Sequence, residues 1–122
     1  MLSVYGFHDS AIEGVTHTAE SLRIRLDNVE DFQTEGVEYL SKVELCFSAV
    51  CDVYVNTLPA DKIEMESPFG ELYSLTIKNN VATMTIFLQW TQPRRTLTKD
   101  ISFRFDSMTF RVIERTIQRS EG

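Results

Sequence analysis

One short stretch of the chain carries residue types that could do nucleophilic chemistry. It reads "FHDSAIEG", Phe7 to Gly14, and places His8, Asp9 and Ser10 side by side. Serine, histidine and aspartate make up a hydrolytic triad, but consecutive side chains of a strand point to opposite faces of a sheet. His8 and Ser10 would share a face without an acid to orient the imidazole. A hydrolytic role for His8 therefore needs a partner from elsewhere in the chain.

Metal and disulfide chemistry are not predicted either. His8 and His17 are nine residues apart, which is about 30 Å along an extended strand, so they cannot share a metal ion. Cys46 and Cys51 are separated by about 16 Å if extended, beyond the reach of a disulfide. No histidines cluster near them as in a zinc site. We expect no cofactor, and reduced thiols that fit a cytoplasmic protein.

Trp90 precedes the basic stretch "PRRTLTK", which contains Arg94, Arg95 and Lys99. Basic residues beside an aromatic ring can bind phosphates or stacked bases. Three positive charges in an acidic chain favour a solvated loop instead, and we expect no binding of nucleic acid. A pocket near His8 or Trp90 that binds a small ligand, or hydrolyses one, is the alternative.

The charge of the chain is unevenly distributed. The net charge of the 122 residues is −6. Residues 1–70 contain 13 acidic and 4 basic residues, whereas residues 71–122 contain 5 acidic and 8 basic residues. The acidic residues concentrate in residues 27–44, where Lys42 is the only basic residue. They are Asp27, Glu30, Asp31, Glu35, Glu38 and Glu44. This stretch is either a solvated acidic loop or a surface that attracts a basic partner and repels nucleic acid.

Alternating apolar and polar residues indicate strands through most of the chain. Leu22, Ile24 and Leu26 alternate with arginines, and Gly14 suggests a bulge in the strand before them. A long segment over 42–56 should bend near 48–50, and the pair Asn79-Asn80 should make a tight hairpin turn. These patterns predict an all-β fold, or a β-rich α+β fold. We expect an antiparallel sandwich or open barrel of about seven strands.

The remaining features describe one ordinary domain over residues 1–122. Pro59 allows at most one short helix, near 58–66, since proline suits the first turn of a helix. The chain is too short to split into two cores. It also contains no run of 18 apolar residues, so we expect no membrane span.

Three segments carry a family resemblance: the opening Phe7–Ser10, the strand pattern "SLRIRLDNV" and the closing "DISFRFDSMTF". In layout they resemble small uncharacterised bacterial domains that open with an aromatic-His-Asp-Ser element and continue as an all-β fold. Similar layouts occur among immunity proteins of bacterial toxin systems. The resemblance implies an all-β cytosolic binding protein and carries over no catalytic or binding residues.

The sequence therefore favours a non-catalytic protein that binds a protein partner. The acidic stretch would dock on a basic toxin domain and occlude its active site. Charge reversal at Glu30, Asp31, Glu35 and Glu38 should then slow association. A small-ligand-binding or hydrolytic domain is the second hypothesis, and a structural domain that pairs sheet edges into a dimer is the third.

Overall fold

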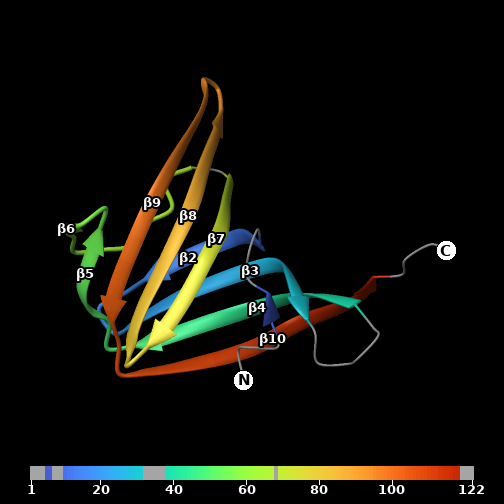
Figure 1. Ribbon diagram of the computed structural model, residues 1–122, viewed down its shortest axis with the longest axis horizontal. Coiled ribbons are helices and arrows are strands. Elements are labelled where there is room, and N and C mark those ends of the chain that lie inside the picture. The colour runs from blue at the N-terminus through green and yellow to red at the C-terminus, as the bar shows by residue number, and fades with distance from the viewer. Residues whose placement is uncertain (1–4, 7–9, 32–37, 68, 119–122) are drawn as a thin grey trace.

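The computed structural model describes residues 5–6, 10–31, 38–67 and 69–118 (Figure 1). These residues form ten β-strands and no helix. The strands are β1 (Tyr5–Gly6), β2 (Ser10–His17), β3 (Ser21–Asp31), β4 (Glu38–Ser48), β5 (Cys51–Val55), β6 (Leu58–Pro59), β7 (Phe69–Lys78), β8 (Val81–Thr91), β9 (Arg94–Arg104) and β10 (Ser107–Gln118). The prediction of an all-β fold is confirmed.

All ten strands belong to one open antiparallel sheet with the order β10-β4-β3-β2-β7-β8-β9-β5-β6, and β1 pairs with β3 beside β2. Within the described residues, strand pairing joins the two halves of the sheet, β10-β4-β3-β2 and β7-β8-β9-β5-β6, through the pairs Ser10–Leu72 and Ala11–Glu71. The predicted number of about seven strands and the sandwich or barrel arrangement are not confirmed.

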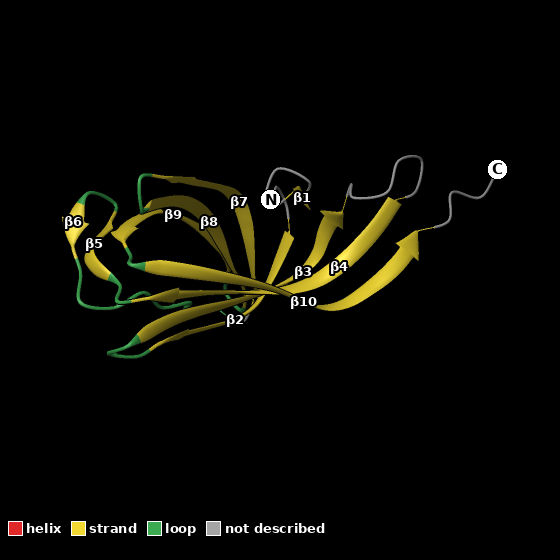
Figure 2. Cartoon of the chain, turned by 90° about the horizontal axis from the view of Figure 1, so that it is seen from below, coloured by secondary structure: helices red, strands yellow, loops and turns green. Residues whose placement is uncertain are grey.

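The sheet is bent, so that its two halves cross steeply and face each other (Figures 1 and 2). Phe47 of β4 lies edge-on against Phe103 of β9, with ring centroids 4.9 Å apart, and against Phe105 at 5.0 Å. The first contact joins the two halves directly, and Phe105 lies in the turn that connects β9 to β10. The hydrophobic core is therefore the space between the two halves of one folded sheet.

The predicted alternation decides which side chains enter this core. Leu22, Ile24 and Leu26 of β3 are buried, while Arg23 and Arg25 between them are exposed. The expected bulge, bend and hairpin are also present. The β2–β3 register shifts between Ile12 and Gly14, β4 and β5 are separated at residues 49–50, and Asn79-Asn80 forms a turn with positive φ at both residues.

Two segments differ from the expectation. Residues 58–66 form no helix, because Asn56 and Thr57 turn the chain with positive φ and Pro59 then pairs with Tyr54 on a sheet edge. Residues 94–99, expected as part of a loop, belong to β9. The β8–β9 register runs unbroken from Val81–Arg104 to Thr91–Arg94. This hairpin continues beyond the end of β7 as an arm (Figure 1). Because the arm is open to solvent, its residues need not alternate.

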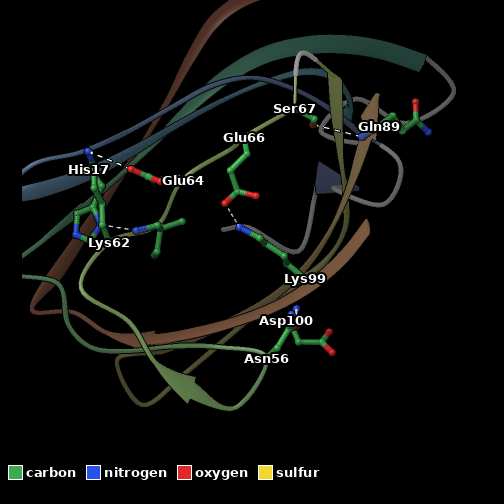
Figure 3. A network of polar contacts seen from close by, with 10 residues as sticks. His17, Asn56, Lys62, Glu64, Glu66, Ser67, Gln89, Lys99 and Asp100 are labelled. Carbon is green, nitrogen blue, oxygen red and sulfur yellow. Dashed lines mark hydrogen bonds and ion pairs between the residues drawn. The ribbon is translucent and has the colours of Figure 1, made fainter. Parts of the chain in front are cut away.

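Residues 60–67 have no regular structure and cross the concave side of the sheet; we call them the strap. Ile63 is buried, and Glu66 forms an ion pair with Lys99 of β9 (Figure 3). Ser67 accepts a hydrogen bond from the backbone N–H of Gln89 at 3.3 Å. At the other end, the N–H of Ile63 donates to Nδ1 of His17 at 2.9 Å. The strap therefore connects the two halves of the sheet.

The hydrogen bond to His17 makes strap attachment depend on pH. Nδ1 accepts a hydrogen bond only when it carries no proton, so protonation of His17 breaks this contact. Burial and the positive charge of Lys62 lower the pKa of His17 from 6.5. The unfolded chain therefore binds a proton at this residue more readily than the folded protein does. The free energy of unfolding should fall as the pH falls through and below 6.5.

We expect His17→Leu to lower the free energy of unfolding at pH 8 by about 1 kcal/mol, the value of one hydrogen bond. The difference between wild type and variant should shrink as the pH falls from 8 to 5. Urea denaturation at several pH values measures this difference. A difference that is constant across this range would show that His17 is not the titrating group.

Candidate functional site

A groove runs across β2, β3 and β4 on the outer surface of the described part of the protein. Its volume is about 580 Å³. It lies on the side of these strands opposite the core, because Arg23 and Arg25 alternate with the buried residues of β3. The residues that line it are Glu13, Gly14, Thr16, Thr18, Ser21, Arg23, Arg25 and Glu44.

Two rows of residues cross the groove from strand to strand. In the first row the register aligns Gly14, Arg25, Glu44 and Arg111. Glu44 accepts contacts from Arg25 at 3.1 Å and from Arg111 at 3.3 Å, and only 13% of its side chain is exposed. One carboxylate thus lies between two guanidinium groups, so this row has an excess positive charge.

The second row aligns Thr16, Arg23, Cys46 and Thr109. Arg23 occupies the position that Arg25 has in the first row, but the residue opposite it on β4 is Cys46 rather than an acid. Among the described residues Arg23 has no ion-pair partner. The guanidinium group of Arg23 is therefore an exposed positive charge available within the groove.

On the side of the first row away from Arg23, the surface around Lys42 has a net negative charge. Lys42 of β4 forms an ion pair with Glu13 at 3.0 Å. This contact, together with the charges of Asp27 and Glu114, raises the pKa of Lys42. Three carboxylates thus surround one ammonium group, and the local charge remains negative after pairing.

The six acids predicted to form a partner-binding surface are not all together. Glu30 and Asp31 end β3, and their register partners Leu40 and Tyr39 place Glu38 beside them at the start of β4. Glu44 is separated from this end and paired with two arginines, so it contributes no free negative charge. Asp27 lies between the two, beside the bulge of β3. Glu35 is outside the described residues.

The residues proposed for other chemistry are also separated. His8 is outside the described residues, and His17 is engaged by the strap. Arg95 lies over the ring of Trp90, 4.0 Å from its centroid, on the β8–β9 arm and away from the groove. Cys46 and Cys51 are free thiols. In the described part of the chain, no three His, Cys, Asp or Glu side chains gather as metal ligands would.

Sequence reasoning missed the groove and its arginines. Arg23 and Arg25 were recognised only as the polar side of a strand. The available signal was the pair of arginines two residues apart, but the residues opposite them on β4 depend on a register that the sequence does not give.

No protein-family model matches this chain, and no curated protein or solved structure was found to be similar to it. The part of the chain that the structure describes also forms no helix that is long and apolar enough to cross a membrane.

Proposed function

We propose that this protein is a non-catalytic binding protein that docks a basic protein partner through an acidic surface. This surface comprises Glu13, Asp27 and Glu114 around Lys42, and it continues along the register to the positions of Glu30, near the end of β3, and Glu38, at the start of β4. A bacterial toxin domain with a basic active-site cleft, such as a nuclease, is the partner that the resemblance to immunity proteins suggests. Occlusion of that cleft would neutralise the toxin.

The observation that carries the proposal is the excess of carboxylates around Lys42. The only base in the acidic stretch is already paired with Glu13, and Asp27 and Glu114 are near it as well. The register adds the position of Glu30 near the end of β3, next to that of Glu38 at the start of β4. Carboxylates gathered around a single ammonium group leave a negative field at the surface. Such a field accelerates encounter with a positively charged partner.

Charge reversal tests this proposal. Wild-type protein is immobilised to capture its partner from the source cell, and the association rate of the purified pair is measured at several salt concentrations. We expect Glu30→Lys/Glu38→Lys to slow association at least about tenfold at low salt, because electrostatic steering is lost. If the partner is a nuclease, an equimolar amount of wild-type protein should also inhibit it.

The matched control is Asp61→Lys/Glu64→Lys, which changes the net charge equally at two exposed positions of the strap. This control should associate nearly as fast as the wild type. Equal slowing in both variants would attribute the effect to total charge, and no slowing in either would disprove docking through the acidic surface.

A further inference from the structure

The second row of the groove lacks the acid that completes the first row. Both rows run across the same four strands, and each has an arginine on β3. Arg25 faces Glu44 on β4, whereas Arg23 faces Cys46. Side chains that are directly opposite on neighbouring antiparallel strands have Cβ atoms about 5 Å apart, close enough for an ion pair. The fold therefore places Arg23 where a carboxylate would be bound, and supplies none.

We infer that this groove is a binding site for a carboxylate presented by an acidic peptide segment, with Arg23 as its principal contact. The neighbouring row gives the reason for a carboxylate, because there a carboxylate is held by guanidinium groups on the same face. Arginine binds carboxylates through paired N–H donors. The exposed residue Thr16 lies directly beside Arg23 in the same row, and its hydroxyl group can add a hydrogen bond to the ligand. Thr109 lies farther away, on the other side of Cys46.

The shape of the groove favours a peptide over a free carboxylic acid. A volume of about 580 Å³ is that of a site for a whole drug-sized molecule. Glu13 and Glu44 also line the groove, so an isolated anion would meet repulsion as well as attraction. A peptide can place one acidic side chain at Arg23 and direct other groups away from these carboxylates. Glu13 belongs both to the lining of the groove and to the acidic surface proposed above, but the contact proposed at Arg23 is opposite in sign to that surface.

The test uses a peptide with blocked ends and a single glutamate between glycines, together with glutarate and inorganic phosphate, as probes of the 122-residue protein at low salt. Binding is followed by calorimetry and by the amide chemical shifts of β2, β3 and β4. We expect the peptide to bind more tightly than glutarate or phosphate and to shift the amides around Arg23. Arg23→Gln should weaken peptide binding about tenfold or more, the loss expected for a charge-assisted contact.

The sharpest variant is Cys46→Glu, which supplies the missing acid from within the protein. The new carboxylate should pair with Arg23 as Glu44 pairs with Arg25, and peptide binding should be lost to the same extent as in Arg23→Gln. Cys46→Gln is the neutral control of equal size and should retain binding. Arg104→Gln removes an exposed arginine from β9 and should also retain it.

Three results would overturn the inference. They are the absence of peptide binding to the wild type, binding that Cys46→Glu leaves unchanged, and binding of glutarate or phosphate as tight as that of the peptide. None of these results depends on the partner of the acidic surface, because Glu30→Lys/Glu38→Lys leaves the groove intact. The two proposals can therefore fail separately.

Discussion

Truncation of Phe47 to alanine should lower the free energy of unfolding by about 3–5 kcal/mol, the largest effect expected from a single substitution here. The side chain of Phe47 is fully buried and lies edge-on against Phe103 and Phe105. Its removal leaves a cavity between the two halves of the sheet and deletes both aromatic contacts. Because the described strands pair across the two halves at just two positions, the aromatic packing around Phe47 contributes strongly to keeping the halves together.

Urea denaturation followed by circular dichroism measures this loss. Phe69→Ala is the matched control, since 56% of Phe69 is exposed and little apolar area is removed from the interior. We expect the control to change the free energy of unfolding by less than about 1 kcal/mol. Similar losses in the two variants would contradict the assignment of Phe47 to the core.

Ile63→Ala should detach the strap and leave the sheet folded. Only 3% of Ile63 is exposed, and it is the deeply buried apolar residue of the strap. Removal of its side chain should cost about 3 kcal/mol, which corresponds to about a hundredfold rise in local opening. Hydrogen exchange should then accelerate by this factor at the backbone N–H groups of Ile63 and Ala60, which are bonded to His17 and Val53.

The amides of β4 provide the internal reference for this experiment, because they lie in the centre of one half of the sheet. Their exchange should change much less than that of the strap. Glu64→Ala alters an exposed strap residue and should leave the Ile63 amide protected. If the strap and β4 lost protection equally, the strap would be part of the global folding unit.

The period-two pattern predicted the strand faces well, because burial of one face of a sheet selects for alternation. Ile24 and Arg25 are on the expected sides of β3, and the chain bends between β4 and β5 as the segment length suggested. The arm residues were predicted to form a loop because both faces of this hairpin are exposed to solvent. Such a hairpin does not require alternating apolar and polar residues. The helix suggested by Pro59 did not form because a tight turn and an edge pairing use the same residues.

The candidate sites could be predicted less well, because they depend on which strands are neighbours. Glu44 looked like one more member of an acidic run, but the register places it between Arg25 and Arg111. Conversely, Arg23 looked like an ordinary solvent-facing residue until its position opposite Cys46 was known. The partners in these pairs are about twenty or more residues apart in the sequence. A local sequence pattern therefore could not reveal the pairing.

The strand order also has a consequence for how the chain folds. Three of its pairings join distant segments: β10 lies beside β4, β2 beside β7, and β5 beside β9. Each of these pairings closes a long loop of the chain. The chain entropy lost on loop closure must be overcome before the new contacts stabilise the fold. Chains dominated by such non-local pairings fold in milliseconds to seconds. The β2–β3 and β7–β8 hairpins can form early, and the joining of the two halves between Ser10 and Leu72 is the step that makes the core.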